Sequence, residues 1–445
     1  MRRSIAAALL VALAAICAES AHAQPGSSAA NPFPESSAGR AMQRITFGAI
    51  DCTRGDPTCP NDAFTTSELF VNGTYADTRL NYNGPLNQAD VSNSLLSLIL
   101  TQSQTFPGAS TASGFTFTVG GVVPVRESDL YGPLFGERAL TNGRKQLSVT
   151  LNTHRLRFSS LDGSEIRNGE HGLLWGDTNY DNAGGAYVGI CRMDINTTVF
   201  FAAANYGLLD QLDVSLAVPV VRTTVEGSNE FLDYVLTGTT ISESTFLPQG
   251  RYYVRGESTG LGDMAIGAKY AFVRRSEAGA AVTVRTSLPT GSLEDMTGTG
   301  EFQTAVGFAG SAEKAGWSPH LNVSYLFAGG EVLDELNYNV GLSYSLIPRR
   351  LTVGGEMVGR RLYNVTEFTS TVQLGVLQSP ITGEFFPIRD FKAEEVDVNL
   401  YFFALGGKAR VGGRLLASVY AIVPTGGSGL QVQRPTFNVG VNYAF

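Results

Sequence analysis

Apolar and polar positions alternate with a period of two along most of the chain from about residue 144 onward. The clearest stretch is LNYNVGLSYSL (336–346), in which Leu, Tyr and Val occupy one parity and Asn, Gly and Ser the other. Because successive side chains of a β-strand point to opposite faces of the sheet, this alternation predicts strands with one apolar face and one polar face.

The predicted strands are long, and their polar face is mostly Gly, Asn, Ser and Ala. Strands of soluble sandwiches average about five to six residues, whereas strands of about nine to eleven residues or more can cross a membrane at a tilt. A bilayer also forbids open sheet edges. We therefore predict an all-β fold, a transmembrane antiparallel up-and-down β-barrel, with twelve strands near 144–158, 192–206, 211–225, 261–274, 279–288, 301–312, 317–328, 335–347, 350–362, 394–405, 409–423 and 435–445.

Connection lengths support this topology. Short connections (YGLLDQ, VRRSEAG, SAEKAGW, LIPRR and LGGKAR) alternate with longer ones near 159–190, 226–259, 289–300, 364–390 and 425–433. Outer-membrane barrels place short turns in the periplasm and long loops outside. An even number of strands then brings the last strand down into the periplasm.

A further strand-like segment, Gly114–Val119 (GFTFTV), leaves the strand number open. It belongs either to an N-terminal plug or, together with a strand near RITFGAI (44–50), to a barrel of fourteen strands. We favour twelve strands with a plug or periplasmic segment. The segment 88–102 shows apolar residues at helical spacing after Asp90, which predicts a short helix there.

The N-terminus has the form of a secretory signal peptide at residues 1–23. Arg2 and Arg3 precede an apolar run, and Ala21-His22-Ala23 forms a cleavage site. We expect an exported outer-membrane protein of a Gram-negative cell. Residues 24–110 then form a leader, a loop and the plug or periplasmic helix, residues 111–143 connect, and residues 144–445 form the barrel.

Composition narrows the function classes. Only 16% of residues are charged and the formal net charge is −8, so nothing suggests a nucleic-acid partner, which needs a basic patch. Cys52 and Cys59 bracket a Gly/Pro turn, which predicts a small disulfide loop. The chain has no C-x₂-C pair, so we expect no metal and no cofactor. It has few histidines and no G-x-S-x-G, so we expect no catalytic site and no enzyme.

Three stretches resemble a known family. YGLLDQLDVSLAVPVVRT, STGLGDMAIGAKYAF and VTVRTSLPTGS are similar to the hairpin, the GLGD-led strand and the strand ending in LPTG of the outer-membrane β-barrel family of the MetA-pathway of phenol degradation type. The resemblance covers about residues 190–445. It implies a barrel that passes small solutes, hydrophobic or aromatic ones among them, and an outline similar to the long-chain fatty-acid transporters with their N-terminal plug.

Strand parity predicts which charged and polar side chains face the lumen. A charge there needs water or a partner, so these groups form either salt bridges that hold the barrel shape or a polar constriction that filters solutes. The candidates are His154, Asp213, Lys269, Arg285, Gln303, Glu356, Arg360, Asp397 and Arg414. Segment 130–144 is expected at the periplasmic entry to the first strand, either anchoring the plug or as ordinary turn packing.

The chain ends on FNVGVNYAF, whose apolar residues would face lipid. Tyr443 and Phe445 are predicted to lie at the periplasmic aromatic girdle and to act as the signal read by the barrel assembly machinery. The expected partners are outer-membrane lipid, that machinery and a small-molecule solute. A structural or adhesion barrel without transport remains the competing function, and the oligomeric state stays open.

Overall fold

The structure is a computed structural model, and it describes residues 37–47, 117–120, 123–126, 130–161, 164–167, 172–180, 183–237, 240–243, 250–275, 277–293, 295–329, 332–378, 385–427, 430–432 and 435–445. The predicted signal peptide, the Cys52–Cys59 loop and the helix at 88–102 lie outside these residues. Among the described helices, none is long and apolar enough to cross a bilayer.

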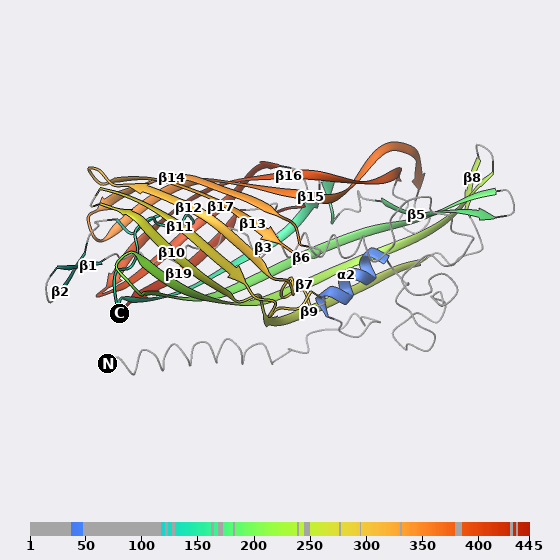
Figure 1. Ribbon diagram of the computed structural model, residues 1–445. Coiled ribbons are helices and arrows are strands. Elements are labelled where there is room, and N and C mark those ends of the chain that lie inside the picture. The colour runs from blue at the N-terminus through green and yellow to red at the C-terminus, as the bar shows by residue number, and fades with distance from the viewer. Residues whose placement is uncertain are drawn as a thin grey trace.

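The described chain forms one closed antiparallel barrel of twelve strands, as the alternation predicted (Figure 1). In order around the ring they are β3 (Leu147–Leu161), β6 (Ala183–Gly207), β7 (Leu212–Thr237), β9 with β10 (Gly250–Leu261 and Ala265–Arg274), β11 (Ala278–Ser287), β12 (Gln303–Ala312), β13 (Trp317–Ala328), β14 (Glu335–Ile347), β15 (Leu351–Gln378), β16 (Phe385–Gly412), β17 (Leu415–Gly427), and β18 with β19 (Leu430–Val432 and Thr436–Ala444).

The ring closes where the last strand pairs with the first. β19 pairs with β3 from Asn438 opposite His154 to Ala444 opposite Ser148. The Phe445 N–H adds a hydrogen bond of 2.7 Å to the Leu147 carbonyl. We call this end of the barrel, which carries the C-terminus and the short turns, the proximal end, and the opposite end the distal end.

The fourteen-strand alternative is wrong. The predicted strand at 114–119 overlaps β1 (Phe117–Gly120), which pairs only with β2 (Val123–Arg126) in a separate two-stranded sheet. That hairpin stands beyond the proximal end in Figure 1. The other candidate strand, near residue 44, is helical up to Phe47.

Several predicted loops are strand instead. β7, β15 and β16 run 26 to 28 residues, so they extend far beyond the shorter β10–β14, as Figure 1 shows. The short strands β4 (Ser164–Glu165), β5 (Gly172–Tyr180) and β8 (Thr240–Glu243) pair with the distal parts of β3, β6 and β7, respectively. The turn predicted at LGGKAR (405–410) lies instead at Gly413-Arg414, because the sequence offers two Gly-Gly pairs and the second one reverses the chain, with Gly413 at φ 51°.

The helix α2 (Ala38–Phe47) was not predicted. Ser37, a residue type favoured at helix N-caps, precedes it, and the Ala38 N–H donates to Ser258 Oγ at 2.9 Å. Ala38, Ala41, Met42 and Ile45 follow the spacing of one helix face and are fully buried. The helix packs against β6, β7 and β9. The surrounding Pro, Ser and Gly residues predict a leader there, and the helix corrects this expectation.

Candidate functional site

The outer and inner faces of the barrel exchange polarity part-way along the strands. On β3, the inward residues Ser148, Asn152 and His154 are polar, but the next inward residues, Leu156 and Phe158, are apolar and fully buried. The outward side chains change in the opposite sense along the same strand, from apolar at residues 149 and 151 to arginine at 155 and 157.

The same exchange occurs on β7, which is separated from β3 by β6. On β7, inward Asp213 and Ser215 give way to Val221 and Val225, while outward Leu216 gives way to Arg222 and Glu226. The proximal part of the barrel is therefore apolar outside and polar inside. The distal part is polar outside and apolar inside, like a barrel standing in water.

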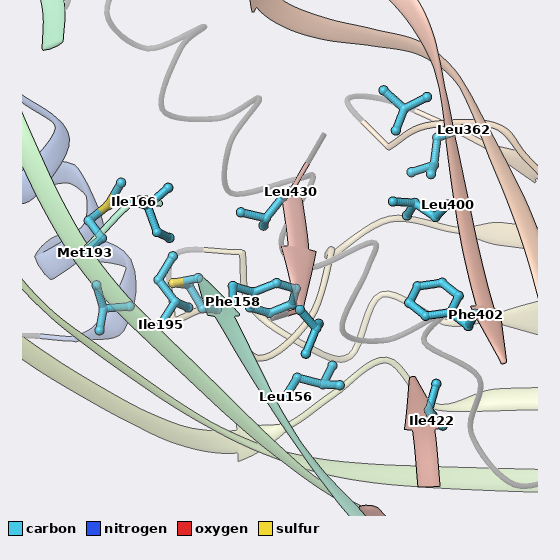
Figure 2. Packing of buried hydrophobic residues seen from close by; sticks show 14 of the residues in the cluster. Leu156, Phe158, Ile166, Met193, Ile195, Leu362, Leu400, Phe402, Ile422 and Leu430 are labelled. Carbon is cyan, nitrogen blue, oxygen red and sulfur yellow. The ribbon is translucent and has the colours of Figure 1, made fainter. Parts of the chain in front are cut away.

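The distal interior holds a cluster of apolar side chains that converge from many strands, as Figure 2 shows. Each is at most 8% exposed. We call this set the distal cluster: Leu156, Phe158, Met193, Ile195, Val225, Val254, Leu362, Val398, Leu400, Phe402, Ile422 and Leu430, with the buried face of α2. Burial of each large member stabilises this packing by about 1.5–3 kcal/mol.

Below the distal cluster lies a cavity of about 290 Å³ inside the lumen. Its walls combine polar and apolar side chains from β6, β7 and β10–β14. Five of the predicted lumen residues line it: His154, Asp213, Lys269, Arg285 and Gln303.

A segment that precedes the first strand occupies the proximal lumen. We call residues 130–142 the lumen segment; Leu130, Tyr131, Leu134 and Ala139 in it are 0–2% exposed. It contacts inward residues from several sides of the ring, since Lys408 on β16 donates to the Pro133 carbonyl and Asn322 on β13 donates to the Glu137 carbonyl at 2.8 Å. The segment that was expected at the periplasmic entry to the first strand therefore lies inside the lumen, where polar side chains on the inner wall bind its backbone.

Glu356 on β15 is the principal anchor of the lumen segment. Its carboxylate accepts hydrogen bonds from the backbone N–H groups of Leu134, Phe135 (3.2 Å to each oxygen) and Gly136 (3.2 Å). Asn339 Nδ2 donates to it at 2.6 Å, and His320 Nε2 lies 3.2 Å from its other oxygen. Charge-assisted hydrogen bonds of this kind are about twice as strong as neutral ones.

A second group of charges joins the other end of the lumen segment to β7 and β10. Lys269 Nζ lies 3.6 Å from Glu137 Oε2 and 4.0 Å from Asp213 Oδ2, and donates to the Arg138 carbonyl at 3.2 Å. Asp213 also accepts from the Asn142 N–H at 2.8 Å. These two predicted lumen residues therefore hold the segment as well as lining the cavity.

The GLGD and LPTG motifs meet in space. Asp263, in the break between β9 and β10, accepts hydrogen bonds from the Gly291 N–H (2.9 Å), the Thr299 N–H (2.7 Å) and the Thr299 hydroxyl (2.6 Å). It thereby fixes residues 288–293 and 295–302, which we call the LPTG loop, beside the cavity. Met296 in this loop is fully buried and packs with the distal cluster, and Gln303 Nε2 donates to Thr299 Oγ1 at 2.7 Å.

Arg360 points inward as predicted, but it does not line the cavity. It forms a buried ion pair with Glu335 on β14, with Nη2 2.7 Å from Oε2 and a second bond from Nε to Oε1. Both side chains are at most 1% exposed. This pair joins two neighbouring strands of the wall.

Two of the residues predicted to face the lumen, Asp397 and Arg414, do not face it. Asp397 points outward, because the inward positions of β16 at this level are the apolar members of the distal cluster. It binds Arg361 at 2.7 Å on the outer surface, and this hydrogen bond holds the pKa of the Asp397 carboxyl below its ordinary value. Arg414 lies in the exposed β16–β17 turn, because the chain reverses later than expected.

Sequence reasoning missed Lys408, which is buried and faces the lumen. The predicted turn covered this position, so no strand parity was assigned to it. The sequence carries no separate signal for the side chain.

The model of the family described as Putative MetA-pathway of phenol degradation matches residues 176–362. This match confirms the resemblance predicted from the motifs, over a shorter stretch than 190–445.

No curated protein matches the chain. Among solved structures, the COG4313 outer membrane channel from Pseudomonas putida F1 is similar with a TM-score of 0.42 and 10% identity, covering 71% of this chain and 99% of that one. A FadL homologue from Pseudomonas aeruginosa has a TM-score of 0.30 and 10% identity, covering 68% and 90%. A mutant of the TodX monoaromatic hydrocarbon channel gives 0.30 and 9%, with the same coverage. At these TM-scores the likenesses support no conclusion about function.

Proposed function

We propose that this chain is an outer-membrane channel for small solutes, including hydrophobic or aromatic ones. The observation that carries the proposal is the exchange of polarity along the strands. The proximal part has the exterior of a membrane barrel, and the distal part offers an apolar interior that leads to a cavity large enough for one small molecule.

The outer belt has the dimensions that a bilayer requires. On β13 the outward apolar residues run from Trp317 to Phe327, which at about 3.3 Å per residue and a tilt of about 40° spans roughly 25 Å. Large apolar side chains that are 38–67% exposed occur on strands round most of the ring, for example Phe272, Leu405 and Val439. Soluble monomers rarely expose so continuous an apolar surface.

Aromatic pairs border this belt at its proximal edge. Trp317 and Tyr344 lie with ring centroids 4.5 Å apart, and Tyr443 and Phe445 4.8 Å apart. At the other edge Arg361 lies 5.3 Å from the centre of the Tyr363 ring, where charged outward residues begin. Such girdles mark the two membrane–water interfaces of outer-membrane barrels, which supports lipid as the partner of this surface.

The solute class follows from the interior and from the family. Transfer of an apolar solute from water to the distal cluster is favourable, because it removes apolar surface from water. The description of the matching family also concerns phenol degradation. The cavity beneath it, whose walls are partly polar and partly apolar, then passes the solute inward once the lumen segment is displaced. Export by the N-terminal signal and recognition of the C-terminus by the barrel assembly machinery complete the proposal.

Uptake by proteoliposomes tests the proposal, with a panel of aromatic solutes and sugars of similar size. We expect the aromatic solutes to enter faster than the sugars, and Phe158→Asn in the distal cluster to slow the aromatic solutes selectively. Arg157→Gln, the neighbouring outward position, is the control. Equal entry rates for both classes, or none above protein-free liposomes, would contradict the proposal.

The lumen segment favours a second function. Because Glu356 and Lys408 hold it inside the barrel, the protein could serve as an anchor for its distal extensions without passing solutes. In that case wild-type protein would show no uptake, and disrupting the segment would alter barrel stability without opening a passage.

A further inference from the structure

One charged group in the lumen cavity differs from all the others that line it. Arg285 on β11 faces inward and remains exposed to the cavity. Within the part of the chain that the structure describes, no hydrogen bond or ion pair reaches its guanidinium. Its five N–H donors are therefore available to a group that enters the cavity.

The barrel wall leaves room around this side chain. In the register of the sheet, Arg285 stands opposite Gly267 on β10 and opposite Ala305 on β12. Neither neighbour has a side chain that could reach the guanidinium or fill the space in front of it. The small residues on both neighbouring strands therefore leave space around the Arg285 side chain.

The carboxylates of the cavity are already occupied. Asp263 accepts three hydrogen bonds from the LPTG loop, and Asp213 accepts from the Asn142 N–H. Glu137, whose charge acts on Arg285, lies 3.6 Å from Lys269. Among the described residues that line the cavity, the unmet donors that face it are therefore those of Arg285, whereas the unpaired oxygens of Asp213 and Asn205 are buried in the wall.

The same cavity also has an apolar wall. Val199 and Phe201 on β6 and Pro219 and Val221 on β7 border the same cavity. Its volume of about 290 Å³ lies at the lower limit of ligand pockets, which limits an occupant to about one ring. An occupant that satisfies both surfaces has an apolar ring and an anionic oxygen pair.

We propose that the cavity is a binding site for a small arenecarboxylate, with the carboxylate on the Arg285 guanidinium and the ring against the apolar residues of β6 and β7. A carboxylate matches the guanidinium with two parallel hydrogen bonds, which a neutral arene cannot form. The inference rests on the proposed function, because a solute reaches this cavity only through the lumen.

Benzoate and its neutral analogue benzamide are the probes, and the full-length protein in detergent is titrated with each by calorimetry. We expect Arg285→Gln to weaken benzoate binding by about tenfold or more, since charge-assisted bonds are lost, and to change benzamide binding less than twofold. Arg285→Lys should retain part of the benzoate affinity because it keeps the charge but not the paired donors. Arg361→Gln, on the outer surface, is the matched control.

A second variant keeps the arginine and fills its site from the facing strand. Ala305→Asp places a carboxylate opposite Arg285 and should abolish benzoate binding, even if Arg285→Gln does not fold. Retention of benzoate binding in either folded variant, or an equal loss of benzoate and benzamide binding, would overturn the proposal.

Flux measurements separate this site from the proposed function. If wild-type protein binds benzoate but admits neither probe into proteoliposomes, the site stands and the channel does not. If it admits neutral aromatic solutes but does not bind benzoate, the channel stands and the site does not.

Discussion

The carboxylate of Glu356 lies 3.2 Å from the backbone nitrogen of Phe135 through both of its oxygens. Phe135 precedes the first barrel strand and Glu356 lies on β15, so this contact joins residues 221 positions apart inside the lumen. The ring of Phe135 adds an edge-to-face contact with Tyr420 at 4.5 Å. Together these interactions keep the lumen segment inside the barrel.

Glu356→Gln should therefore raise single-channel conductance in planar bilayers. The amide offers one acceptor oxygen without charge, and each charge-assisted hydrogen bond lost weakens the hold on the segment by about 1.5–3 kcal/mol. Since about 1.4 kcal/mol corresponds to a tenfold change in an equilibrium, we expect the open state to become at least about tenfold more populated. Glu257→Gln, an exposed outward glutamate, is the control, and unchanged conductance in Glu356→Gln would show that the segment does not obstruct the pore.

Asp263→Asn and Gly298→Ala should both release the LPTG loop. The first removes the negative acceptor of three hydrogen bonds. The second adds a Cβ that would lie 2.4 Å from the Gly291 Cα and 2.6 Å from Asp263 Oδ1, so the backbone must move. Faster proteolytic cleavage of the loop measures the effect. Gly412→Ala is the control, because its Cβ would meet nothing within 4 Å, and its loop should be cleaved at the wild-type rate. A loop as resistant as in the wild type in both Asp263→Asn and Gly298→Ala would contradict the assigned role of Asp263.

Glu335→Ala should destabilise the barrel by about 3–5 kcal/mol, because it removes the carboxylate that pairs with the buried Arg360 guanidinium. Replacing both residues with apolar ones of similar size should restore most of the loss. Urea unfolding in detergent measures both variants. The neighbouring pair Arg361–Asp397 is exposed, and breaking it with Asp397→Ala should cost at most about 1 kcal/mol. Equal losses from Glu335→Ala and Asp397→Ala would refute the distinction between the two pairs.

Deletion of Phe445 should lower the amount of folded barrel in the outer membrane. The residue closes the seam through its N–H bond to Leu147 and presents a ring that is 39% exposed beside Tyr443. The fraction of protein whose gel mobility changes on heating measures how much of the barrel has folded. Phe437→Ala, on the outward face of the same strand and 64% exposed, should assemble close to the wild-type level. Normal assembly after the deletion would argue against a terminal signal.

Strand parity placed most of the predicted lumen residues correctly. It failed at the distal level, where polar side chains do not face inward. The parity of β3, β7, β10 and β11 placed His154, Asp213, Lys269 and Arg285 inward as the structure has them. Asp397 failed because the same rule, polar side chains inward, was applied to a distal level where the interior is apolar. An alternating pattern gives two faces, but it does not say which of them meets water.

The sequence by itself determined the alternating strands, their antiparallel order and the closing seam, because period-two alternation and connection length are local properties of the chain. The choice of twelve strands over fourteen needed the structure. Only the tertiary structure decided where the lumen segment lies, which aspartate holds the LPTG loop and which arginine is left with open donors. These depend on which inward side chains meet across the ring, as Glu356 meets Phe135 and Asp263 meets Thr299. Contacts between residues so far apart in sequence follow from barrel closure and register, which no local pattern encodes.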